Sequence, residues 1–102
     1  MLSVYVTCAS EGEAAKIALA TVKERLAACA NYFPCKSIYE WNGKIAKEKE
    51  FVLVLKAAER GYKKLEARIR QLHSYEVPCI VATKVTRAYQ PYEKWVSKQA
   101  NQ

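Results

Sequence analysis

The feature that most constrains the fold of this chain is the pair Asn42-Gly43, which lies between two long stretches of strand-forming residues. An Asn-Gly pair tolerates the two positive φ angles of a type I′ turn, so it is a strong local indicator of a β-hairpin. The outgoing strand is expected to cover about residues 29–41, with a break near Pro34. The returning strand is expected to cover about residues 44–57, ending in the apolar run FVLVLK.

This hairpin is too long for the body that carries it. At about 3.3 Å per residue, each arm spans more than about 40 Å, whereas a chain of 102 residues should have a radius of gyration of only about 13 Å. The hairpin must therefore extend beyond its own domain and expose unpaired strand edges, which proteins usually cover by pairing with another chain. We therefore expect a single domain, residues 1–102, that forms an oligomer.

The N-terminal third predicts a strand followed by a helix. The segment SVYVTC, residues 3–8, alternates apolar and polar side chains, as a half-buried strand does. Ser10 and Glu13 have the spacing of a capping box, in which both side chains satisfy free amides at a helix start. Apolar residues then recur at helical spacing, so the pattern predicts a helix from about Glu11 to about Ala27.

The C-terminal half predicts a second helix, a fourth strand and a short last helix. Apolar residues at helical spacing from Tyr62 to Leu72 indicate the second helix, which must stop before Pro78. VPCIVATKV, residues 77–85, reads as a strand, and QPYEKWVSKQ, residues 90–99, as a helix with a proline in its first turn. The order βαββαβ plus a helix predicts an α+β fold of the ferredoxin-like type, an antiparallel sheet with two helices on one face.

Composition and charge disfavour several classes of protein. With 51% apolar and 26% charged residues, the chain is typical of a folded domain. No apolar run approaches the roughly 20 residues that cross a bilayer, and no basic stretch precedes the first strand, so we expect a cytoplasmic protein with no membrane partner. The net charge of +7 is spread along the chain, which favours a solvated basic surface over a nucleic-acid partner.

Several blocks of sequence together carry a family resemblance. They are ERLAACAN (residues 24–31), SIYEWNGKI (37–45), the returning strand from Glu50 to Lys56, LHSYEVP (72–78), and Tyr92 with Trp95. In this order and spacing, the chain resembles the CutA family of divalent-cation tolerance proteins over essentially its full length. The resemblance implies a ferredoxin-like subunit of a tight homotrimer, linked to tolerance of copper and other divalent metals, with metal ions as ligands and no established enzymatic reaction.

The chain departs from the usual pattern of that family at three positions. The common HPY is His73-Ser74-Tyr75 here, and Cys79 takes the place of a glutamate that usually follows the proline. Where some relatives carry two adjacent histidines, this chain has Leu72-His73. Any site that needs both histidines is therefore incomplete.

Cys8, His73 and Cys79 form the candidate metal site. In a ferredoxin-like sheet the first and fourth strands are antiparallel neighbours, so the end of one and the start of the other share an edge, and His73 follows the second helix at the same edge. Thiolate and imidazole suit cuprous copper or zinc, and no obligatory cofactor is expected. We also expect the following helix N-terminus to favour the Cys8 thiolate.

Inert packing is the alternative for every cysteine, because cysteine is among the most buried residue types. In a cytosolic protein, four cysteines are more often thiols than a disulfide framework, although intracellular proteins of extreme thermophiles are an exception, and the spacing does not decide between them. Cys29 and Cys35 lie roughly 20 Å apart on one straight strand, too far to share a metal ion or a disulfide, and packing is favoured for both. His73 considered alone fits a hydrogen-bonded residue at the end of a helix.

A second candidate site matches the positions of the family motif around the clefts between subunits. It comprises Trp41, Glu50, Lys56, Tyr75 and Glu76. The charged residues form either structural ion pairs between chains or a pocket for a small anion or metabolite. The second interpretation leaves open a rival function, a trimeric signalling protein that binds a small ligand or nucleotide in its intersubunit clefts.

Other functions lack their motifs. A metallochaperone of this fold requires CxxC after the first strand, whereas this chain reads Cys8-Ala9-Ser10-Glu11. The returning strand, KEKEFVLVLK, lacks the aromatic signature of RNA-recognition modules. Neither GxSxG, a P-loop nor HExxH occurs, so no hydrolase is indicated and the chain is not expected to be an enzyme.

Overall fold

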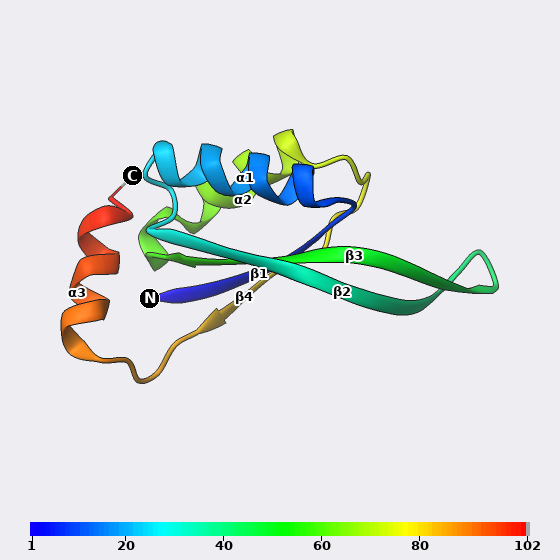
Figure 1. Ribbon diagram of the computed structural model, residues 1–102. Coiled ribbons are helices and arrows are strands. Elements are labelled where there is room, and N and C mark those ends of the chain that lie inside the picture. The colour runs from blue at the N-terminus through cyan, green and yellow to red at the C-terminus, as the bar shows by residue number, and fades with distance from the viewer. Residues whose placement is uncertain (102) are drawn as a thin grey trace.

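A four-stranded antiparallel sheet in the order β2-β3-β1-β4 forms the centre of the molecule, as the computed structural model of residues 1–101 shows (Figure 1). In chain order, the elements are β1 (Leu2–Cys8), α1 (Glu11–Lys23), β2 (Cys29–Trp41), β3 (Lys44–Ala57), a short 3-10 turn (Glu59–Gly61), α2 (Tyr62–Leu72), β4 (Ile80–Lys84) and α3 (Gln90–Gln99). The predicted α+β fold with ferredoxin-like order is confirmed. None of the helices in residues 1–101 has the length and apolarity needed to cross a bilayer.

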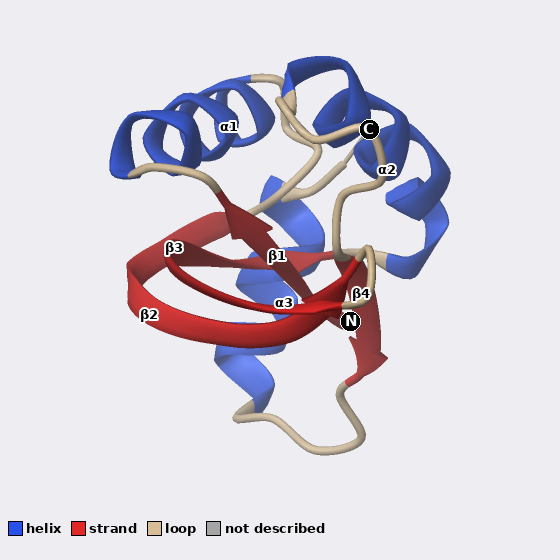
Figure 2. Cartoon of the chain, turned by 90° about the vertical axis from the view of Figure 1, so that its right-hand side faces the viewer, coloured by secondary structure: helices blue, strands red, loops and turns tan. Residues whose placement is uncertain are grey.

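The hydrophobic core lies between the sheet and the pair α1 and α2, which cover the same face (Figure 2). Alternate residues of β1 point into this core, so Val6 is fully buried opposite Leu53 of β3. Ile17 of α1 and Leu65 of α2 are also fully buried. The period-two burial of β1 follows from the pleat of a strand, which sends successive side chains to opposite faces.

The hairpin of β2 and β3 extends past the helices, as predicted (Figure 1). Asn42 and Gly43 both have positive φ, at 52° and 76°, as a type I′ turn requires. The longest dimension of the molecule is 45 Å, against 26 and 21 Å for the other two. Near the turn, Ile38 is 71% exposed and Trp41 is 65% exposed, so this arm presents apolar side chains that no part of residues 1–101 covers.

Helix α1 ends at Lys23, earlier than the predicted end near Ala27. Arg25 adopts φ 61°, its amide donates to Val22 O, and the Leu26 amide donates to Thr21 O at 2.9 Å. This pair of bonds is the Schellman arrangement, in which a left-handed residue ends the helix. The apolar periodicity continues past this point, but the residue in the left-handed position is an arginine, so no glycine signalled the stop.

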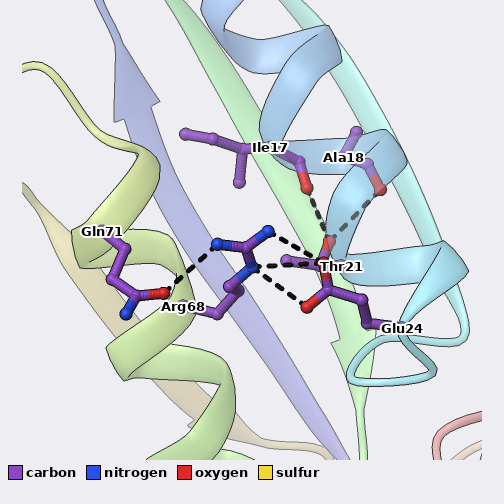
Figure 3. Close-up of polar contacts among 6 residues, drawn as sticks. All are labelled: Ile17, Ala18, Thr21, Glu24, Arg68 and Gln71. Atoms are coloured by element: carbon purple, nitrogen blue, oxygen red, sulfur yellow. Dashed lines mark hydrogen bonds and ion pairs between the residues drawn. The ribbon is translucent and has the colours of Figure 1, made fainter.

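A surface contact between Arg68 of α2 and Glu24 at the end of α1 links the two helices (Figure 3). Arg68 of α2 donates to both carboxylate oxygens of Glu24, with Nη2 2.9 Å from Oε2, and also to the side chain of Gln71. Beneath this contact, the buried Thr21 hydroxyl donates to Ile17 O at 2.8 Å. A bidentate pair of this kind sets the relative position of the two helices.

Helix α3 packs at the end of the sheet away from the hairpin turn (Figure 1). Its fully buried Val96 joins a small second cluster with Ala28, Ala58 and Ala100. The carbonyls of Ser97 in α3 and of Ala100, which follows the helix, accept from Arg60 Nη2 at 2.9 and 3.1 Å. Arg25 adds bonds to Asn101 Oδ1 at 3.1 Å and Lys98 O at 3.3 Å. Two arginines thus satisfy acceptors at the free C-terminal end of the helix.

Candidate metal centre

Three elements meet where β1 ends, and each places one metal-ligating side chain there. Cys8 is the last residue of β1, Glu13 lies in the first turn of α1, and His73 follows the last turn of α2. One ligand atom from each residue lies within 4.8 Å of the others. The structure therefore joins two of the predicted ligands, Cys8 and His73, with a carboxylate that was not predicted.

The donor set fits a soft or borderline metal ion. Sulfur, imidazole nitrogen and carboxylate oxygen bind zinc at about 2.0–2.3 Å, so in a tetrahedral site two donors of one ion lie about 3.3–3.8 Å apart. The donor atoms here lie within 4.8 Å of one another, so side chains would move by up to about 1 Å to close on an ion. When bound, such an ion would be held by Cys8, Glu13 and His73, with water or another group free to complete the coordination.

Both ring nitrogens of His73 already have backbone partners. Nε2 lies 2.7 Å from Thr7 O, and Nδ1 lies 3.1 Å from the amide nitrogen of Tyr75. A carbonyl can only accept and an amide can only donate, so these contacts place the proton on Nε2 and leave Nδ1 as an acceptor. Glu13 Oε1 is 3.9 Å from Nδ1, and the imidazole is fully buried. His73 therefore has the hydrogen-bonded role expected of it alone, and metal binding must replace one of these bonds.

Cys8 is held as a neutral thiol. Burial, with the nearby charges of Glu13 and Glu50, raises its pKa to about 12. The expectation that the helix N-terminus would favour the thiolate is therefore wrong, because desolvation penalises the anion more than the helix amides stabilise it. A metal ion would have to displace this proton, so uptake at the site should strengthen as pH rises.

Glu13 fastens two backbone segments with one carboxylate. Oε1 accepts the amide of Ala9 at 2.9 Å, and Oε2 accepts the amide of Ser74 at 2.8 Å. Partial burial opposes ionisation, but the hydrogen bonds from Ser74 and Ala9 outweigh it and lower the pKa of Glu13. The Ser10 side chain accepts from the Glu13 amide, as the capping box predicts, while the glutamate reaches Ala9 one residue before the cap.

Cys79 lies outside this cluster, which corrects the predicted ligand set. Val6 pairs with Ile80 across β1 and β4, so Cys79 comes one residue before that pair, next to Thr7 along the ladder. Thr7 and Cys8 point to opposite faces of the sheet because side chains alternate along a strand. Cys8 and Cys79 therefore lie at the same edge of the sheet but on opposite faces of it. The capping-box spacing could have indicated Glu13, because such a glutamate reaches back toward the strand that precedes the helix.

Glu50 and Tyr75 of the second candidate site are in direct contact. Tyr75 Oη donates to Glu50 Oε2 at 2.6 Å, and Glu50 is only 7% exposed. Burial and the Glu50 charge raise the pKa of Tyr75 well above its usual range, so the hydroxyl stays protonated and donates. No ion pair within residues 1–101 involves Glu50.

The other three residues of this second set do not reach Glu50 within one chain. Lys56 is six residues further along β3, roughly 20 Å away, and it forms no ion pair with any carboxylate of residues 1–101. Trp41 lies at the tip of the hairpin, and Glu76 is exposed after Tyr75. The prediction that these residues converge in a cleft between subunits therefore stays a prediction, because within one chain the length of the strand separates Lys56 from Glu50.

The fold and the cluster define a small α+β protein with a buried thiol, carboxylate and imidazole at one end of its sheet. The model of the CutA1 divalent ion tolerance protein family matches residues 2–99. The chain therefore belongs to the CutA1 family, as its resemblance indicated.

Known proteins of several organisms are similar to this chain. It is 40% identical to a divalent-cation tolerance protein CutA of Thermus thermophilus over 94 residues, 91% of each chain. It is 37% identical to one of Pyrococcus horikoshii over 99 residues, 97% of each chain. A solved structure from Archaeoglobus fulgidus, described as a periplasmic divalent cation tolerance protein, superposes with a TM-score of 0.96 at 32% identity, covering 99% of this chain and 100% of that one.

Proposed function

We propose that this chain is a single-domain subunit of a cytoplasmic homotrimer that binds a divalent or cuprous metal ion and catalyses no reaction. The observation that carries the proposal is the convergence of Cys8, Glu13 and His73 within 4.8 Å. The cluster is buried and its donors suit copper or zinc, while its acid and base groups are engaged with backbone partners. The CutA1 family membership supports a role in tolerance of divalent ions.

The exposed hairpin supports assembly. Strand β2 is an edge strand along its whole length, and its exposed side chains include Phe33, Ile38 and Trp41. An unpaired edge with apolar side chains of this extent is normally covered by another chain. A second copy of the hairpin is the occupant we propose, and the resemblance to the CutA family supports three copies.

Elemental analysis of untagged protein, followed by titration with zinc and copper, tests metal binding. Cys8→Ser and His73→Gln should each weaken zinc binding at least tenfold, because each removes one protein ligand. Cys35→Ser, a cysteine outside the cluster, is the control, and Cys79→Ser tests the predicted ligand that lies elsewhere. Circular dichroism verifies that each variant is folded. Unchanged zinc affinity in both ligand variants would refute this site.

Binding of a small anion or nucleotide remains the second candidate, and one cleft favours it. A cleft of about 570 Å³ lies between the start of α1 and the hairpin, lined in part by Lys36, Lys49 and the buried Glu50. The two lysines supply positive charge for an anion. Calorimetric titration with inorganic phosphate and ATP separates the candidates, because phosphate binding that survives Cys8→Ser but is lost in Lys49→Met would support the cleft.

A further inference from the structure

We propose that metal binding at Cys8, Glu13 and His73 is coupled to the Glu50–Tyr75 contact through the segment His73–Tyr75, so that occupying one loosens the other. The inference rests on the proposed metal binding and goes beyond it, because it links the metal centre to a buried contact on β3 that is not part of the ligand set. The segment His73–Tyr75 can transmit this effect because its residues contact both the metal centre and Glu50.

Hydrogen bonds within this segment and to its surroundings fix its position. The Ser74 amide donates to Glu13 Oε2 at 2.8 Å, and the Tyr75 amide donates to His73 Nδ1 at 3.1 Å. The Tyr75 hydroxyl then donates to Glu50 Oε2 at 2.6 Å. The rings of His73 and Tyr75 are also in contact, with centroids 4.8 Å apart. The imidazole and the tyrosine therefore cannot move independently.

Metal and backbone compete for the same atom of His73. With its proton on Nε2, held by Thr7 O at 2.7 Å, the neutral imidazole has one lone pair, on Nδ1. Nδ1 is also the nitrogen that lies 3.9 Å from Glu13, the other ligand. An ion on Nδ1 would take the only acceptor of the Tyr75 amide. The carboxylate of Glu13 has several acceptor sites, so it can bind an ion and keep the Ser74 amide.

An unpaired amide in a part-buried position is costly, so the segment must shift when Nδ1 is taken. That shift displaces Tyr75, whose short bond to Glu50 requires good alignment. Coupling free energies are reciprocal. Removing the Tyr75–Glu50 bond must therefore release the segment and raise the metal affinity.

Zinc titration of Tyr75→Phe tests this coupling. The hydroxyl bond goes to a carboxylate, so its loss should tighten zinc binding about tenfold. Tyr62→Phe is the matched control: Tyr62 also donates to a glutamate, Glu66, at 3.1 Å, but this bond lies within α2 and does not involve the segment, so zinc affinity should not change.

Hydrogen exchange gives a readout that does not depend on affinity. In the wild-type protein, zinc should speed amide exchange of residues 73–76, while exchange in the α1 core stays unchanged. The coupling is overturned, and the proposed metal site is not, if Tyr75→Phe binds zinc within twofold of the wild-type affinity. The same conclusion follows if zinc slows amide exchange of residues 73–76. If wild-type protein binds no zinc, or binds it without any effect of His73→Gln, both this inference and the proposed metal site fail.

Discussion

Replacing Glu13 with glutamine should destabilise the folded protein by about 2–5 kcal/mol, because one carboxylate accepts two backbone amides in the wild type. The amides belong to Ala9 and Ser74, and their nitrogens lie 2.9 and 2.8 Å from the two oxygens. Glutamine has one carbonyl oxygen, so its NH2 group must face one of these donors. The Glu13 side chain is only 12% exposed, so water replaces the lost acceptor poorly.

The magnitude follows from the charge and the number of bonds. A hydrogen bond to a charged group contributes about 1.5–3 kcal/mol, and a neutral one about 1 kcal/mol. The variant loses one charged bond and converts the other to a neutral bond. For a domain of this size, 1 kcal/mol corresponds to a melting shift of about 4–8 °C, so a fall of about 10 °C or more is expected.

The effect of Glu13 on stability should depend on pH. Burial opposes ionisation, but hydrogen bonds from Ser74 and Ala9 lower the pKa below its ordinary value of 4.5. The unfolded chain therefore binds a proton at higher pH than the folded one, and the contribution of Glu13 is fully present above about pH 5. The contribution is lost as pH falls through the lower folded pKa, so wild type and Glu13→Gln should converge in acid.

Urea denaturation of both proteins at equal concentration, with a chelator present, measures this difference at pH 7 and at pH 3. Equal protein concentration matters because assembly adds to apparent stability. Glu11→Gln is the matched control: it removes the same charge from the same helical turn, but Glu11 is exposed, so it should cost less than about 1 kcal/mol. A Glu13→Gln effect no larger than that of Glu11→Gln, or one that persists unchanged at pH 3, would refute the reasoning.

Three further changes test the hairpin, the end of α1 and the docking of α3. Replacing Asn42-Gly43 with Ala-Val should disrupt the hairpin and the assembly, because both residues have positive φ and β-branched side chains resist it; sedimentation shows the outcome. Arg25→Ala should cost about 1–2 kcal/mol and Arg25→Gly about 1 kcal/mol less, because glycine removes the strain at φ 61°; urea denaturation compares the two. Val96→Ala should cost about 2 kcal/mol and increase proteolysis within α3, because Val96 is the buried contact of that helix.

Local signals in the sequence located most elements well. The hairpin arms, the turn and α3 fall where they were predicted, because Asn-Gly, alternating side chains and a proline near a helix start each act over a few residues. The end of α1 was misplaced by a local exception, the left-handed Arg25. That conformation is accompanied by bonds to Lys98 and Asn101, which lie far away in the sequence.

The candidate sites depended on contacts between distant segments. Cys8 and His73 were predicted from strand order, which the βαββαβ pattern determines, and the structure brings them together. Cys79 falls on the opposite face of the sheet from Cys8, whereas the predicted intersubunit site with Lys56 involves contacts that one chain does not contain. The second partner of Glu13, Ser74, is 61 residues away.

The sequence by itself determined the order of strands and helices, the overhanging hairpin and the family, because these depend on periodicity, turn chemistry and motifs that are read along the chain. Only the tertiary structure decided the chemical state of the site. Burial keeps Cys8 protonated, and the two backbone bonds of His73 select its tautomer. Desolvation and hydrogen-bond partners are supplied by residues that meet only when β1, α1 and α2 pack together.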